Sequence, residues 1–237
     1  METKKVEPGR QFLAEQGLNL YAVFDCATLP EVITQSLREN DIRPEAYSRL
    51  VLLGNGGQQL WPALSRFGMQ TADPVDYYSL RMAHTFINDY LNRADHLILY
   101  PARYTVPLQQ LGALAGWHHP SPLGLGINPT YGLWFAYRVA FLTTAGLPLT
   151  EKMGGSSPCH TCTDKPCFSA CPAGAVQGVG RLDLPACAGY RLQAQSPCQD
   201  RCLSRLACPI APEHRYPMKQ VNYHYRHSLN SIRRYFE

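Results

Sequence analysis

The pattern of apolar and polar positions divides the chain into two parts of different character. Residues 1–153 alternate short apolar runs with segments of helical periodicity, whereas residues 154–212 show little apolar periodicity. For the first part, the pattern predicts strands at 18–24, 50–53, 96–100 and 133–143, and helices near 8–16, after residue 73 and at 108–117. The first part is therefore expected to combine helices with strands.

The helix expected after residue 73 has the clearest signature. Asp73 can cap it, and Pro74 suits its first position. Its apolar stripe consists of Val75, Tyr78, Met82, Phe86 and Tyr90, with Ala83 and Ile87 alongside. The glycine-rich segment 54–57, which follows the strand expected at 50–53, predicts a turn that could present backbone N–H groups to an anion or amide. It matches no nucleotide-binding fingerprint, so an ordinary strand-to-helix turn is the simpler interpretation.

Composition narrows the class of protein. A hydrophobic fraction of 45% excludes a disordered chain, and a net charge of +4 is too small to indicate nucleic acid or membrane by itself. Arg138 and Pro148 interrupt the most apolar window, so no membrane span is expected. The first ten residues lack the apolar run of a secretory signal, which favours a cytoplasmic, reducing location.

Cysteine distribution sets the expected domain boundaries. Eight of the nine cysteines lie between Cys159 and Cys208, and only Cys26 lies outside, where it reads as a small buried residue. Residues 153–158, with the sequence MGGSSP, resemble a flexible joint. We therefore expect domains at 1–153 and 154–212, followed by a basic, aromatic tail at 213–237 that packs as a helix.

The first cysteine run has the spacing of an iron–sulfur protein. Residues 159–172 read CHTCTDKPCFSACP, a C-x2-C-x4-C-x3-C-P pattern. Two cysteines in a tight loop can bind one cluster, while the C-x3-C-P element carries the fourth cysteine away. Zinc also binds C-x2-C pairs, but it does not call for the C-x3-C-P element.

A second set of cysteines completes eight ligands, the number that two [4Fe–4S] clusters require. In two-cluster ferredoxins the fourth cysteine of each run binds the other cluster. The expected ligands are Cys159, Cys162, Cys167 and Cys208 for one cluster, and Cys171, Cys187, Cys198 and Cys202 for the other. The alternatives are zinc, a single cluster with spare cysteines, and disulfides, which a reducing compartment disfavours.

Two stretches carry a resemblance to known families. The run at 159–172 resembles the ferredoxin-like electron-transfer subunits of molybdenum oxidoreductases. The stretch at 121–149, SPLGLGINPTYGLWFAYRVAFLTTAGLPL, resembles the region before the clusters in epoxyqueuosine reductase and corrinoid reductive dehalogenases. Residues 128–138 and 73–86 are also similar to the type-C cobalamin-processing protein. The resemblance implies an α+β fold: a nitroreductase-like, cobalamin-processing-type domain followed by a small ferredoxin-like iron–sulfur domain.

The resemblance also implies a corrinoid site. Carried over position by position, the expected corrinoid contacts are Gly126, Asn128, Tyr131, Gly132, Trp134, Phe135 and Arg138. Cys187 and Tyr190 match a Cys-x-x-Tyr that supplies a cluster ligand in epoxyqueuosine reductase, which agrees with the crossed assignment. Asn128 stands where the processing protein has histidine, so no histidine ligand to cobalt is expected there. The catalytic acid is not assigned, and its candidates are Asp73, Asp76, Tyr100 and Tyr104.

Three functions follow as hypotheses. The first is a cobalamin-dependent or cobalamin-processing oxidoreductase. In it, ferredoxin, flavodoxin or a reductase donates electrons to the clusters, and the clusters pass them to a corrinoid. The second is a corrinoid-free electron-transfer protein whose first domain docks a partner or holds flavin. The third is a tRNA-modifying reductase, because the tail mixes basic and aromatic residues; a packed helix explains that tail more simply. His118 and His119 are expected in a solvated loop.

Overall fold

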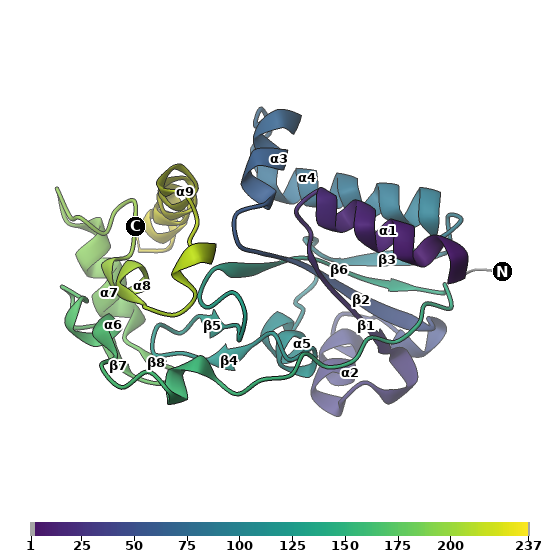
Figure 1. Ribbon diagram of the computed structural model, residues 1–237, viewed down its shortest axis with the longest axis horizontal. Coiled ribbons are helices and arrows are strands. Elements are labelled where there is room, and N and C mark those ends of the chain that lie inside the picture. Colours follow the sequence, from purple (N-terminus) through teal and green to yellow (C-terminus); the bar gives the residue numbers. More distant parts are fainter. Residues whose placement is uncertain (1–2, 237) are drawn as a thin grey trace. The chain divides into compact units, whose positions relative to one another are not determined.

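The computed structural model describes the backbone of residues 3–236 and the side chains of residues 5–235. The chain divides into two compact units (Figure 1). The first unit runs up to Gly116 and resumes at Phe135–Met153, and the second comprises Trp117–Trp134 and the chain from Gly154 onward. The segment 117–134, which the sequence-based boundary assigned to the first domain, therefore belongs to the cysteine-containing unit.

The first unit is built on a four-stranded antiparallel sheet of order β1-β2-β6-β3. Its strands are β1 (Leu20–Asp25), β2 (Arg49–Gly56), β3 (His96–Tyr100) and β6 (Phe135–Thr143). Its helices are α1 (Thr3–Glu15), α2 (Glu31–Arg38), α3 (Leu60–Phe67), α4 (Pro74–Thr85) and α5 (Leu108–Leu114). Figure 1 shows α1 and α4 on one side of the sheet and α2 and α5 on the other. Because both faces are covered, the central strand β2 is buried from Leu50 to Gly56.

The four predicted strands and the three predicted helices of this part are confirmed to within a few residues. Asp73 and Pro74 occupy the expected positions at the start of α4. After Thr85 the chain continues as a π-helical turn, Phe86–Tyr90, which keeps Phe86 and Ile87 buried. Most of the stripe predicted along this segment is therefore part of the core, whereas Met82 and Tyr90 are only half-buried.

The turn expected at 54–57 begins later in the structure. Residues 54–56 continue strand β2, because Asn55 and Gly56 pair with Ala136 and Phe135 of β6. The chain turns only at 57–59, where Gly57 has a φ of 70°. A β-bulge between Leu53 and Gly54 accompanies this extension. Gly54 and Gly56 therefore belong to strand β2, and Gly57 begins the turn.

The second unit consists of short elements joined by loops. Its strands are β4 (His119–Pro120), β5 (Gly126–Ile127), β7 (Val176–Gly178) and β8 (Arg181–Leu182). Its helices are α6 (Pro166–Ser169), α7 (Leu184–Leu192), α8 (Leu203–Ala207) and α9 (Met218–Phe236), with 3-10 turns at Pro158–His160 and Pro212–His214. Two-stranded hairpins pair β4 with β5 and β7 with β8. His119 therefore lies in a short strand rather than in the loop expected for the histidine pair.

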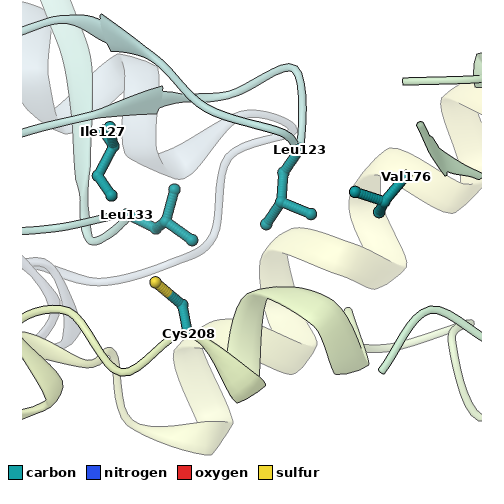
Figure 2. Close-up of a cluster of buried hydrophobic side chains, with 5 residues drawn as sticks. All are labelled: Leu123, Ile127, Leu133, Val176 and Cys208. Carbon is teal, nitrogen blue, oxygen red and sulfur yellow. The ribbon is translucent and has the colours of Figure 1, made fainter. Parts of the chain in front are cut away.

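A small core explains why the segment 117–134 belongs to this unit. Figure 2 shows its five buried residues, Leu123, Ile127, Leu133, Val176 and Cys208, with the Cys208 sulfur directed toward Leu133. Three of the five come from 117–134. The partly buried residues packed on them are Cys159, Cys167, Phe168, Cys171, Leu182 and Ile210. The segment supplies the apolar surface that the cysteine-rich part lacks.

The tail at 213–237 forms a helix, as expected, over Met218–Phe236. Val221 and Leu229 of this helix are buried, and Val221 packs with Tyr216 and Trp134. Among the described residues, no helix is long and apolar enough to cross a membrane.

Gly132 should be indispensable for the packing of the second unit. Its φ of +56° disfavours any other residue, and a Cβ there would lie 2.7 Å from the carbonyl oxygen of Ile210. We expect Gly132→Ala to lower the free energy of unfolding by about 2 kcal/mol or more. Gly180→Ala is the matched control, because Gly180 also has a positive φ, of +69°, but open space around it. Urea unfolding followed by circular dichroism checks this, and equal losses in both variants would contradict it.

Candidate functional site

The structure gathers eight cysteines into two groups of four within the second unit. The first cysteine group, which lines one cavity, consists of Cys159, Cys162, Cys167 and Cys208. The second cysteine group, which lines another cavity of about 940 Å³, consists of Cys171, Cys187, Cys198 and Cys202. Cys171 is thereby separated from the other three cysteines of its own run, and Cys208 from its neighbours in sequence. The crossed assignment made from the spacing divides the cysteines in the same way.

Short helical elements position the first cysteine group. Cys159 lies in the 3-10 turn Pro158–His160, and Cys167 lies in α6, which Lys165 starts with a left-handed φ of 40°. Cys208 caps the C-terminal end of α8 and is buried in the small core. Chain segments more than forty residues apart in sequence thus meet at one cavity.

Helices α7 and α8 position the second cysteine group. Asp183 caps α7 by accepting a hydrogen bond of 2.9 Å from the backbone N–H of Ala186, and Cys187 lies one turn into this helix. Cys202 is the N-cap of α8, where its sulfur accepts a hydrogen bond of 3.4 Å from the backbone N–H of Arg205. Such N–H···S contacts stabilise a thiolate, and they help to set the potential of a cluster.

Without a metal, five of these eight thiols resist ionisation. Burial, and then the neighbouring thiols of the same group, raise the pKa of Cys159, Cys167 and Cys187 above the ordinary value. Burial likewise raises the pKa of Cys198 and Cys208, against an opposing contribution from backbone N–H groups. Four thiolates in one cavity therefore need positive charge at its centre, which a bound metal centre supplies.

The number of thiols in each group bears on the kind of metal centre that the group could hold. A zinc site would bring three or four ligands to about 2.3 Å from one ion. Among residues 3–236, no three His, Cys, Asp or Glu side chains lie close enough together to hold a metal ion. All nine cysteines are free thiols, so they form no disulfide. Each group brings four thiols to one cavity, and four thiolates are the ligand set that one [4Fe–4S] cluster requires.

Two arginines, of which Arg191 is buried and Arg205 half-buried, connect the ligand loops to the rest of the unit, and the sequence analysis identified neither. Arg191 is only 8% exposed; it donates to the carbonyl oxygen of Cys198 at 3.1 Å, to that of Tyr225 at 2.8 Å and to Ser228 Oγ at 3.0 Å. This arginine therefore ties α7 and a cysteine loop to α9. A basic residue in the last turn of a helix that carries a cysteine is the one signal that the sequence offered.

Arg205 ties α8 to the segment 117–134. Its guanidinium donates to the carbonyl oxygen of Leu133 at 2.6 Å and lies 4.5 Å from the ring centroid of Trp134. Tyr216 contributes a second aromatic contact at 5.4 Å. Trp134 is completely buried in these contacts, so its ring has a structural role within the unit.

The seven expected corrinoid contacts divide between the two units. Gly126, Asn128, Tyr131, Gly132 and Trp134 lie in the second unit, and Phe135 and Arg138 in the first. None of them lines either cysteine cavity. The ring of Tyr131 lies 4.8 Å from that of His214, and burial raises its pKa.

Asn128 is fully buried, and both the oxygen and the nitrogen of its side-chain amide form hydrogen bonds. Its Oδ1 accepts hydrogen bonds of 2.9 Å from the N–H groups of Thr130 and Tyr131, and its Nδ2 donates to Trp117 O at 3.2 Å. Its backbone also pairs with Gly132. The side chains of Asn128 and Trp134 are therefore held in the fold, and a direct corrinoid contact does not fit them.

In the first unit, Arg138 is buried and donates from Nε to Asn55 Oδ1 at 2.6 Å. Burial, followed by the nearby Asp76 carboxylate, raises the pKa of Tyr100, while Arg138 opposes that rise. Two of the four candidate acids, Asp76 and Tyr100, are therefore neighbours. Tyr104 lies instead under the Arg103 guanidinium, at 5.5 Å.

The remaining candidates have simple surroundings. Cys26 is buried beside the first sheet, and burial raises its pKa to about 12, so it is an unreactive thiol. His118 and His119 are both partly buried, and burial lowers the pKa of His118. Neither belongs to a group that could hold a metal ion among the described residues.

No protein-family model matches the sequence, and no curated protein matches it. Solved structures do share its fold. An epoxyqueuosine reductase from Bacillus subtilis aligns with a TM-score of 0.58 at 13% identity, over 92% of this chain and 68% of the other. An epoxyqueuosine reductase solved with an epoxyqueuosine-modified tRNA stem loop aligns at 0.57 and 12%, over 94% and 69%.

A catabolic reductive dehalogenase, NpRdhA, solved with 3-bromo-4-hydroxybenzoic acid, aligns with a TM-score of 0.59 at 13% identity. This alignment covers 98% of the present chain but only 35% of the dehalogenase. At such identities the similarity establishes a shared mixed α and β fold. It agrees with the resemblance drawn from residues 121–149.

Asn128 should act as a structural residue. Asn128→Ala removes both sides of a buried amide and leaves its partners without hydrogen bonds, which should cost about 2 kcal/mol or more of unfolding free energy. Asn128→Asp keeps the oxygen that accepts from Thr130 and Tyr131 but sets a carboxylate oxygen against the Trp117 carbonyl, so it should also be destabilising. Thermal unfolding of the two variants checks this. A fully stable Asn128→Ala protein would contradict the structural role.

Proposed function

We propose that this protein is an iron–sulfur redox protein that holds two [4Fe–4S] clusters in its second unit. The observation that carries the proposal is the division of eight cysteines between two cavities, with four cysteines lining each. The first cysteine group would hold one cluster and the second cysteine group the other. When bound, such clusters supply one-electron transfer at potentials set by their surroundings.

We further propose that the electrons reach a corrinoid. Support comes from the resemblance at 121–149 and from a fold shared with epoxyqueuosine reductases and a reductive dehalogenase. A bound corrinoid would supply a cobalt centre whose most reduced state is a strong nucleophile. Of the expected contacts, Gly126, Tyr131, Gly132, Phe135 and Arg138 remain the proposed ones.

The first unit would contribute a positive charge in a fixed position and a group that carries a proton. Asn55 fixes the guanidinium of Arg138 by a hydrogen bond of 2.6 Å, so a buried positive charge stands in one place on β6. Burial, and then the Asp76 carboxylate, raise the pKa of Tyr100, so its hydroxyl holds its proton more tightly than an exposed tyrosine does. Tyr100 and Asp76 stay candidates for the catalytic acid, which is not assigned.

Corrinoid-free electron transfer is the second candidate function. It is favoured by the engagement of Asn128 and Trp134, two of the expected corrinoid contacts, in hydrogen bonds and packing of the second unit. In that case the first unit would dock a partner or hold flavin. The visible spectrum of the aerobic protein distinguishes these cases, because flavin has structured bands whereas iron–sulfur clusters give a broad shoulder.

Binding of tRNA is the weaker alternative. It draws on the basic residues of α9 and on the tRNA stem loop of one structural neighbour. Unchanged mobility of tRNA with the protein at low salt would remove it.

Electron delivery to cobalt is the direct test. Anaerobically purified protein, photoreduced and mixed with cob(II)alamin, should convert it to cob(I)alamin, seen by visible absorption, and cobalt should co-elute on gel filtration. Protein with intact clusters that leaves cob(II)alamin unchanged and retains no cobalt would refute the corrinoid function. The same result would be compatible with corrinoid-free electron transfer.

Single substitutions can test the crossed assignment of ligands. Cys208→Ala and Cys159→Ala should remove the same cluster, because both residues belong to the first cysteine group. Cys171→Ala and Cys187→Ala should remove the other. Electron paramagnetic resonance of the reduced protein should therefore show the same residual signal within each pair. Cys26→Ala, the control, should change nothing.

An uncrossed arrangement gives a different result. In that case Cys171→Ala would leave the same residual signal as Cys159→Ala, because both cysteines come from the run at 159–172. That pairing would contradict the grouping seen in the structure.

A further inference from the structure

The surface around the second cysteine group is apolar and exposed. The cavity of about 940 Å³ that these cysteines line is also lined by Leu125, Leu184 and Tyr235, whose exposed fractions are 40%, 66% and 84%. Large apolar side chains that gather at one opening of a protein commonly mark an interaction site. The first cysteine group has a different setting, because the small core packs against it.

A basic groove adjoins this cavity. The groove, of about 700 Å³, lies between α9 and the loop before α8, and its charged residues are Asp200, Arg201, Arg226 and Arg233. Arg201 lines both the groove and the cavity of the second cysteine group. The apolar opening and the basic groove are therefore parts of one continuous face.

The groove keeps a positive excess after its internal pairing. Asp200 is the single carboxylate lining it, with ion-pair distances of 2.8 Å to Arg201 and 3.4 Å to Arg226. Arg233 is exposed one helical turn beyond Asn230. The whole second unit has ten Lys and Arg against five Asp and Glu, whereas the first unit has twelve against thirteen. Positive charge is thus concentrated on the unit that holds the cysteines.

We propose that this face docks a small acidic redox protein, of the ferredoxin or flavodoxin kind, which exchanges electrons with the second cluster. The proposal rests on the proposed iron–sulfur function. An apolar centre with a charged border is the usual anatomy of a protein interface, and complementary charge speeds the encounter. Electron-transfer complexes are small and short-lived, so such a partner needs no large interface.

RNA fits the same face less well. The Asp200 carboxylate lies among the arginines and would repel a phosphate, and of the three exposed side chains at the opening only Tyr235 offers a ring on which a base can stack. A carboxylate-rich protein surface can pair with Arg226 and Arg233 while its apolar residues cover the leucines.

Charge reversal on the groove tests the proposal. The probe is an acidic plant-type [2Fe–2S] ferredoxin, mixed with the protein by stopped flow in whichever direction electrons flow. Arg226→Glu/Arg233→Glu should slow the second-order exchange at low ionic strength by about tenfold or more, and salt should erase most of the difference. Lys152→Glu, an exposed charge reversal in the first unit, is the matched control and should change the rate little.

A second variant covers the loss of the Arg226–Asp200 ion pair. Arg233→Glu alone leaves that pair intact and should slow exchange by a smaller factor. Rates equal to that of Lys152→Glu in both variants would overturn the proposal, as would wild-type protein that exchanges no electrons with the ferredoxin. Loss of binding to a tRNA stem loop in the variants, with exchange unchanged, would assign the face to RNA and overturn it as well.

Reduction by photoexcited 5-deazariboflavin, a small uncharged donor, separates this proposal from the function on which it rests. Each variant should be reduced to the same extent as wild type by this donor. If wild type lacks iron and sulfide or is not reduced, the iron–sulfur function itself fails. If reduction is normal while ferredoxin exchange is insensitive to the groove, only the docking face fails.

Discussion

Charge compensation in two cysteine-lined cavities is the constraint on which the second unit depends. Burial, followed by repulsion from neighbouring thiols, raises the pKa of Cys159 in one cavity and of Cys187 in the other. Such groups are unfavourable as free thiolates and become favourable only around a positively charged centre. The unit is short of apolar surface, so a metal centre in each cavity would act as a staple as well as a redox group. The same metal centres would therefore both stabilise the unit and carry out its proposed redox chemistry.

The rest of the unit holds these cavities in shape. The segment 117–134 contributes Leu123, Ile127 and Leu133 to the core beside Cys208. Arg205 fastens α8 to this segment, and Arg191 fastens the Cys198 loop to α9. Because both arginines donate to backbone carbonyl oxygens, they fix the path of the chain around the cysteines. The basic helix α9 thereby has two roles, one in packing and one on the surface next to the second cysteine group.

Cysteine spacing and apolar periodicity were informative because each reflects a local requirement. The C-x3-C-P element directs Cys171 away from Cys159, and the structure separates them. The strand patterns at 96–100 and 133–143 reappear as β3 and β6. By contrast, the membership of 117–134 depends on contacts distant in sequence, with residues 176 and 208, which no local pattern encodes. The hydrogen bonds of Asn128 could not be predicted for the same reason, because one of them joins its side chain to the backbone of Trp117.

Metal and sulfide content per chain is the measurement that tests the central claim most directly. Protein purified without oxygen should contain about eight iron and eight sulfide, as two [4Fe–4S] clusters require, and no zinc. Zinc in the absence of sulfide would contradict the account, because the two cysteine groups would then hold single ions. About four iron and four sulfide would contradict the claim that both groups hold a cluster.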